Sequence, residues 1–225
     1  MELKLNKTND HTILKAFAQA EHIEKLCADA KKYDFASVCV NPYNIPLAKK
    51  FLEGTDVKVC TVIGFPLGAN TTKIKAAETE DAYEMGCDEF DMVINVGALK
   101  DGRYDYVRDD IKAVVDAAKG RLVKVIIETF FLTDEEKIKA VELACEAGAG
   151  FVKTCTGFNE GVATVHDIEL MRKAADPKVK VKASSGIKTY KDAKALIDAG
   201  AERLGTSSGA KILSESGEYE DSNKD

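Results

Sequence analysis

The sequence predicts one α/β domain, a single (β/α)8 TIM barrel, and three observations favour this fold. Short apolar segments rich in β-branched residues alternate with helical patterns along the chain, as expected for parallel strands joined by helices. Eight strand segments are present, which is the number that closes such a barrel. The length of 225 residues is one that a single barrel commonly reaches.

The eight expected strands follow one another along the whole chain. In order they span residues 10–14, 35–40, 57–65, 89–94, 121–128, 150–154, 178–183 and 202–207. If the first segment were not a strand, the others would allow an open sheet instead. The sequence contains neither G-x-G-x-x-G nor G-x-x-x-x-G-K-[ST], which argues against dinucleotide-binding and P-loop folds.

Helical patterns fill the intervals between these strands. Residues 22–33 and 106–119 each place their apolar side chains on one face, which is the mark of an amphipathic helix. Thr133, followed by three acidic residues, predicts a helix start. We expect the barrel over residues 1–213, and the polar segment 214–225 as a C-terminal tail.

The composition narrows the classes of function. The chain carries 32 Lys and Arg against 38 Asp and Glu, a formal net charge of −6, so it lacks the basic surface of a nucleic-acid-binding protein. No apolar run approaches the roughly 20 residues of a membrane-spanning helix, and no secretory signal is visible. The six cysteines form no C-x-x-C pair, so no metal site is predicted, and a reducing, cytoplasmic location is expected.

Charged side chains occupy positions where a barrel interior should be apolar. Strand side chains alternate between two faces, and four of the expected strands have one apolar and one mixed face. The mixed faces carry Glu89, Asp91, Lys124, Glu128, Lys153, Lys180 and Lys182. Because an unpaired buried charge costs several kcal/mol, we expect a paired ionic network inside the barrel. The alternative for any single lysine is a solvated position at the surface.

Two lysines near the ends of neighbouring strands indicate amine chemistry. Lys153 and Lys182 lie near the C-terminal ends of their strands, where barrel active sites form. A free lysine is almost entirely protonated at pH 7, and a second ammonium nearby together with desolvation favours the neutral amine. Such an amine forms a Schiff base with a carbonyl substrate. No histidine lies on these strands, so imidazole catalysis is not indicated.

Two loops of small polar residues predict a phosphate site. Ser184-Ser185-Gly186 follows the seventh strand, and Thr206-Ser207-Ser208-Gly209 follows the eighth. Barrels often bind phosphate between these two loops, on backbone N–H groups and a short helix N-terminus. Loops of this composition are also common as plain turns, and their placement after both strands favours the phosphate site.

The sequence resembles the deoxyribose-phosphate aldolase family over residues 8–213. The segments that carry the resemblance are DHTILK (10–15), FASVCVNPY (35–43), TVIGFPLGANTTKIKAAE (61–78), DEFDMVINVGALKDGRY (88–104), VKVIIET (123–129), LTDEEK (132–137), FVKTCTGF (151–158), VKASSGIKT (181–189) and RLGTSSG (203–209). The resemblance implies a class I aldolase without metal or cofactor. Its reaction would split 2-deoxy-D-ribose 5-phosphate into acetaldehyde and D-glyceraldehyde 3-phosphate.

The resemblance also assigns roles to residues of this chain. Lys153 would form the Schiff base, Lys182 would be the second lysine, and Asp91 would be the acid that works with it in proton transfer. Substrate-binding positions would be Asp10, Thr12, Gly157, Ser185, Gly186, Gly205, Ser207 and Ser208. The implied partners are small phosphosugar and aldehyde substrates, and a homo-oligomer is left open.

The chain departs from the family pattern at several positions. Ser185 stands where many members have glycine, so a side chain enters the phosphate loop. Lys188 stands where arginine is common, which weakens bidentate phosphate contact. Ala16 replaces a frequent proline. Some members end with a tyrosine that reaches the site, and here Tyr219 is the candidate substitute.

Two other functions remain open from the residues alone. One is a different aldolase or an isomerase that handles phosphosugars on the same barrel, which the identity of the products would distinguish. The other is a protein that binds a phosphorylated metabolite without catalysis. The combination of Lys153, Lys182 and Asp91 favours an enzyme, because a binding protein has no need of an activated amine.

Overall fold

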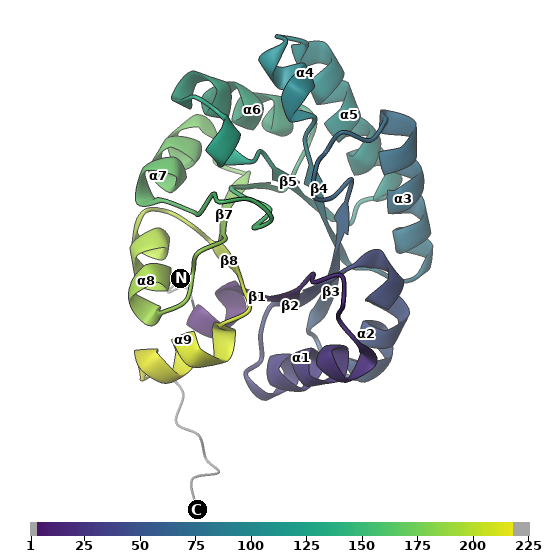
Figure 1. Ribbon diagram of the computed structural model, residues 1–225, viewed down its shortest axis with the longest axis vertical. Coiled ribbons are helices and arrows are strands. Elements are labelled where there is room, and N and C mark those ends of the chain that lie inside the picture. The colour runs from purple at the N-terminus through teal and green to yellow at the C-terminus, as the bar shows by residue number, and fades with distance from the viewer. Residues whose placement is uncertain (1–3, 218–225) are drawn as a thin grey trace, which may run out of the picture.

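The chain forms a closed barrel of eight parallel strands, which confirms the predicted fold class. The computed structural model describes residues 4–217. Viewed down the barrel, the strands form an inner ring and the helices an outer ring (Figure 1). The strands pair in chain order, and the last pairs with the first. They are β1 (Asn9–Ile13), β2 (Ser37–Val40), β3 (Lys58–Ile63), β4 (Glu89–Val93), β5 (Leu122–Ile126), β6 (Phe151–Lys153), β7 (Lys180–Ser184) and β8 (Arg203–Thr206).

Helices connect the strands on the outside of the barrel. They are α1 (Ala20–Lys32), α2 (Ile45–Phe51), α3 (Thr72–Glu84), α4 (Val96–Lys100), α5 (Tyr104–Ala117), α6 (Asp134–Glu146), α7 (Val165–Ala174), α8 (Tyr190–Asp198) and α9 (Gly209–Ser216). Three short 3-10 helices accompany them: η1 (Leu5–Thr8), η2 (Pro42–Asn44) and η3 (Thr129–Phe131). Thr133 and Glu136 form the capping box expected at the start of α6. Among residues 4–217, no helix combines the length and the apolar character needed to cross a membrane.

Successive side chains of a strand point alternately to the helices and into the barrel, and the two sides pack differently. Val123 and Val125 of β5 point outward and belong to the main apolar core between strands and helices. Lys124 lies between them and points into the barrel, where it contacts Asp91. The apolar cluster inside the barrel is small and consists of Leu14, Cys39, Cys60 and Val62. Charged side chains therefore fill much of the barrel interior.

Three segments differ in detail from the expectations. Lys180 lies on the same face of β7 as Lys182 but is exposed, because it is the first residue of the strand and solvent reaches that end of the barrel. Glu128 does not continue β5, since the strand ends at Ile126 and the backbone of Glu128 has a left-handed φ of 57°. Residues 214–216, expected at the start of the tail, belong to α9. Tyr219 and the other residues beyond 217 lie outside the described residues.

A buried ion pair fastens α3 to the barrel. The Nζ atom of Lys75 lies 2.5 Å from the Oδ2 atom of Asp110 in α5, and neither side chain is exposed. The same ammonium donates to the carbonyl of Val93 at the end of β4, at 2.9 Å. Gly64, after β3, packs directly on the Lys75 side chain, and a Cβ atom there would lie 2.9 Å from Cε. Lys75 thus joins two helices to the strand that carries Asp91.

We expect Lys75→Met to destabilise the fold by about 3–5 kcal/mol, because it leaves the carboxylate of Asp110 buried without a counter-charge. Urea unfolding followed by circular dichroism measures the change. Lys73→Met is the matched control on the same helix, since Lys73 is exposed, and it should change stability by less than about 0.5 kcal/mol. Equal effects of the two variants would contradict this assignment.

Candidate active site

The carboxylate of Asp91 lies at the centre of the charged barrel interior. Its Oδ2 atom accepts hydrogen bonds from the ammonium groups of Lys153 and Lys182, each at 2.7 Å. Its Oδ1 atom accepts from Lys124 at 2.8 Å and from the thiol of Cys60 at 3.1 Å. The four donors come from four different strands, so the barrel itself fixes this arrangement.

A second layer of charges lies beside this centre. Lys182 also donates to Asp10, and the guanidinium of Arg203 donates to Asp10 at 2.7 Å and to Glu89 at 2.9 Å. Lys124 lies 2.7 Å from Glu89. Each of the three carboxylates in this network, Asp10, Glu89 and Asp91, therefore contacts at least two cations, as a buried ionic network requires.

Opposite charges keep Asp91 and Lys182 ionised despite their burial. Burial alone would raise the pKa of Asp91, but three neighbouring ammonium groups lower it well below its usual range. Burial would lower the pKa of Lys182, yet the carboxylates of Asp10 and Asp91 outweigh this and raise it. The network contains three carboxylates, Asp10, Glu89 and Asp91, and four cations, Lys124, Lys153, Lys182 and Arg203.

Asp91 also lies between Lys153 and Lys182, two ammonium groups that would otherwise repel each other. Its Oδ2 atom bridges Lys153 and Lys182, so its negative charge offsets much of their mutual repulsion. The same geometry suits proton transfer, because a proton on either amine has an acceptor within hydrogen-bond distance.

A cavity of about 880 Å³ opens where the C-terminal ends of the strands meet their loops. Lys153 lines this cavity, whereas Asp91 and Lys182 lie beneath it and are not exposed. Seven of the expected substrate-binding residues also line it: Thr12, Gly157, Ser185, Gly186, Gly205, Ser207 and Ser208. The structure thus brings the expected amine and both expected phosphate loops to one cavity.

Asp10 lies apart from the other expected substrate-binding residues. It is fully buried and is not among the residues that line the cavity. Both of its carboxylate oxygens accept hydrogen bonds from network partners, Lys182 and Arg203. Its neighbour Thr12 does line the cavity, and the Thr12 hydroxyl donates to the Asp10 carbonyl at 2.8 Å.

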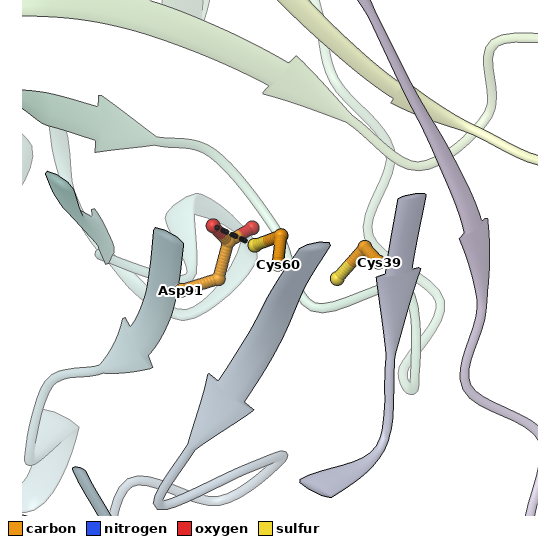
Figure 2. A group of neighbouring side chains, drawn as sticks. All are labelled: Cys39, Cys60 and Asp91. Atoms are coloured by element: carbon orange, nitrogen blue, oxygen red, sulfur yellow. Dashed lines mark hydrogen bonds between the residues drawn. The ribbon is translucent and has the colours of Figure 1, made fainter. Parts of the chain in front are cut away.

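Cys39, Cys60 and Asp91 form the one group among residues 4–217 whose side chains have the proximity of metal ligands. Figure 2 shows them on three neighbouring strands, with the sulfur of Cys60 toward the carboxylate. Burial raises the pKa of the Cys60 thiol well above its ordinary value, so the thiol keeps its proton and donates to Asp91. Lys124 lies 3.3 Å from the Cys60 sulfur. Lys153 and Lys182 occupy the other oxygen of Asp91. These ammonium groups would repel a metal cation at this group, which makes it an unfavourable ligand environment.

Sequence reasoning missed four residues that contribute to the site. Arg203 completes the ionic network, and its position two residues before Gly205 on β8 could have placed it on the inward face. Cys60 lies in an apolar run of the sequence, and nothing in that run signals its contact with Asp91. Phe65 and Phe158 pack edge to face, with ring centroids 5.0 Å apart, and Phe158 lines the cavity. No local pattern signals this pair, because the two residues lie on separate loops.

The lowered pKa values of Asp10 and Asp91 predict sensitivity to acid. Burial would raise the pKa of Asp10, but Lys124, Lys182 and Arg203 lower it. Both carboxyls therefore bind protons less readily in the folded than in the unfolded chain. Their stabilisation is complete above the ordinary pKa of about 3.9 and is lost as the pH falls below it.

We expect the free energy of unfolding to decrease by about 1–3 kcal/mol for each pH unit below 3.9. Urea unfolding at a series of pH values between 7 and 3 measures this dependence. A free energy that stays constant below pH 3.9 would show that these carboxyls are not stabilised by the network.

Comparison with known proteins agrees with this geometry. The model of the DeoC/LacD family aldolases matches residues 5–215. A deoxyribose-phosphate aldolase from Streptococcus suis (strain 98HAH33) is 60% identical over 211 residues, 94% of this chain and 96% of the relative. One from Clostridium tetani (strain Massachusetts / E88) is 58% identical over 215 residues, 95% of this chain and 100% of the relative.

Solved structures show the same similarity. The tetrameric deoxyribose phosphate aldolase from Aeropyrum pernix has a TM-score of 0.87 at 32% identity, covering 93% of this chain and 89% of that one. The aldolase QR15 has a TM-score of 0.90 at 40% identity, covering 95% of this chain and 96% of that one. Sequence, fold and the amine-lined cavity agree, and the chain belongs to the DeoC/LacD aldolase family.

Proposed function

We propose that this protein is a class I aldolase that reversibly cleaves 2-deoxy-D-ribose 5-phosphate to acetaldehyde and D-glyceraldehyde 3-phosphate. The observation that carries the proposal is the amine of Lys153, which lines the cavity and also donates to the buried carboxylate of Asp91. The relatives named deoxyribose-phosphate aldolase support this choice of substrate. The corresponding metabolic role is the catabolism of deoxyribose phosphate.

The proposed chemistry begins with attack of the Lys153 nitrogen on the aldehyde carbon of the substrate. Loss of water gives an iminium ion, which serves as the electron sink. The C3 hydroxyl then loses its proton, the bond between C2 and C3 breaks, and its electron pair forms an enamine. Glyceraldehyde 3-phosphate leaves. Protonation of the enamine at C2 and hydrolysis release acetaldehyde and regenerate the amine, so no metal or cofactor is required.

We assign the proton transfers to Asp91 and Lys182. The Asp91 carboxylate lies 2.7 Å from both amines, which is hydrogen-bond reach for a proton that leaves Lys153. Lys182, whose pKa is raised by its neighbouring carboxylates, supplies a positive charge that keeps Asp91 ionised. Lys182 has no exposed surface, so any proton it exchanges with substrate passes through a neighbouring group in the site.

We place the substrate phosphate between the loops that follow β7 and β8. Ser185, Gly186, Ser207 and Ser208 line the cavity there, and α9 begins directly after Ser208. Backbone N–H groups at a helix N-terminus favour an anion. The phosphate end of the substrate would thus be held far from the carbon that Lys153 attacks.

The remaining expectations concern assembly and location. The tetrameric relative from Aeropyrum pernix supports a homo-oligomer for this chain as well. All six cysteines are free thiols, which suits the reducing conditions of the cytoplasm that we propose as its location.

The decisive test is reduction with borohydride in the presence of acetaldehyde, followed by mass mapping of the modified peptide. We expect one trapped adduct, on Lys153, and Lys153→Leu should lose both this adduct and turnover of deoxyribose 5-phosphate. Lys180→Leu is the matched control, because Lys180 lies on the neighbouring strand but is exposed at its opposite end. An adduct that persists in Lys153→Leu would rule out Lys153 as the nucleophile.

Ser208→Asp tests the phosphate assignment. Aspartate is a favoured N-cap residue, so the helix start tolerates it, but its charge repels the phosphate by roughly 1–4 kcal/mol at about 4 Å. We expect kcat/KM for deoxyribose 5-phosphate to fall about 5- to 1,000-fold. Unphosphorylated deoxyribose should lose far less.

Ser208→Asn supplies the control for the Ser208→Asp variant, because asparagine is similar in shape, also caps helices well and carries no charge. If Ser208→Asp reduces activity equally toward both substrates, the defect is general and the phosphate is bound elsewhere.

A further inference from the structure

The loop between β6 and α7, residues 154–164, forms one wall of the cavity. It begins directly after Lys153 and contributes Thr156, Gly157 and Phe158 to the lining. The loop packs tightly against its neighbours on both sides. A Cβ atom at Gly161 would lie 2.5 Å from Cβ of Phe130, and one at Gly186 would lie 2.8 Å from Cβ of Val162. Its position therefore depends on the segments that follow β5 and β7.

On one side, Ser185 binds the loop through both its side chain and its backbone. The Ser185 hydroxyl donates to the carbonyl of Gly161 at 2.7 Å, and the Ser185 carbonyl accepts from the N–H group of Ala163 at 3.1 Å. The preceding residue, Ser184, donates to the carbonyl of Cys155 at 2.6 Å. The Ser185 side chain is thus directed at the loop, where it has a specific hydrogen-bond partner.

On the other side, Glu128 holds the start of the loop. Its buried carboxylate accepts from the N–H group of Thr156, at 3.3 Å and 3.2 Å to its two oxygens. Glu128 follows β5, and Ser185 follows β7, so these two side chains reach the loop from the strands on either side of β6.

Both residues have a positive φ, a backbone conformation that residues other than glycine rarely adopt. Glu128 has a φ of 57° and Ser185 a φ of 79°. The other residues between 4 and 217 with positive φ, glycines aside, are Asp34 and Lys119, which are exposed in turns before β2 and β5. Strained residues that persist at a site indicate that the surrounding structure requires their conformation. Here that conformation directs each side chain at the same loop.

We propose that Glu128 and Ser185 are positioning residues that clamp the β6–α7 loop from both sides and fix the phosphate end of the substrate. The inference rests on the proposed function. Lys153 is held separately, by Asp91 at 2.7 Å, so the clamp acts on the binding of the phosphorylated substrate. It does not act on the formation of the Schiff base.

Paired substitutions at Ser185 separate the clamp from general stability. Ser185→Ala and Ser185→Gly both remove the hydroxyl, but only alanine keeps the strained backbone. We expect both to raise KM for deoxyribose 5-phosphate about 3- to 10-fold, the effect of one hydrogen bond, with kcat and acetaldehyde trapping within about twofold of wild type. The glycine variant should melt about 2–4 °C above the alanine variant.

Substitutions at Lys119 control for backbone strain, and substitutions at Glu128 test the second contact to the loop. Lys119→Ala and Lys119→Gly repeat the backbone comparison at a positive φ away from the cavity, and should differ in melting temperature without a change in KM. Glu128→Ala should raise KM as the Ser185 variants do. Glu128→Gln keeps a side-chain oxygen as acceptor and should restore a KM within about twofold of wild type.

Hydrogen–deuterium exchange of residues 154–164 gives a readout that needs no activity. The proposal expects faster exchange in Ser185→Ala, Ser185→Gly and Glu128→Ala. An unchanged KM in these variants would overturn it, and so would a raised KM without faster exchange, since Ser185 would then contact the substrate directly. If the wild-type protein neither cleaves the substrate nor traps acetaldehyde, the proposed function fails, and exchange alone decides whether the clamp exists.

Discussion

The barrel interior is arranged around one buried carboxylate, that of Asp91. Its two oxygens accept hydrogen bonds from four donors, and one of these donors is Lys153. Within the described part of the chain, Lys153 is the only amine of the network that lines the cavity. Removing this carboxylate would leave three ammonium groups facing one another in a desolvated space, which is strongly unfavourable. The other buried charges are neutralised in the same way. Arg203, for example, pairs with both Asp10 and Glu89.

The sequence was sufficient to predict the barrel, because each strand repeats a simple alternation. Residues 121–126 show why: valines on one face pack under helices, while Lys124 on the other face enters the barrel. The same alternation placed Lys153 and Lys182 together. The prediction from alternation was wrong at Glu128, because the backbone there has a positive φ and the strand has already ended. At Lys180 the predicted face was correct, but this end of the strand is exposed to solvent.

The parts of the site that could not be predicted depend on contacts between distant segments. The aromatic pair Phe65 and Phe158 joins loops after β3 and β6, and nothing local to either residue signals its partner. Ser185 was expected to place a side chain in the phosphate loop. Its bond to the carbonyl of Gly161 follows from the course of another loop, which sequence periodicity does not describe.

The charge count of the network has a consequence for the reaction cycle. Four cations face three carboxylates, so the buried cluster carries one formal positive charge. Once the proton that Lys153 gives up has left the cluster for the substrate or solvent, the cluster is formally neutral, and formation of the iminium ion restores the positive charge. The interior therefore alternates between two charge states that differ by one unit of charge. Over one complete cycle the cluster returns to its starting charge, so the reaction requires no net change in the charge of the barrel interior.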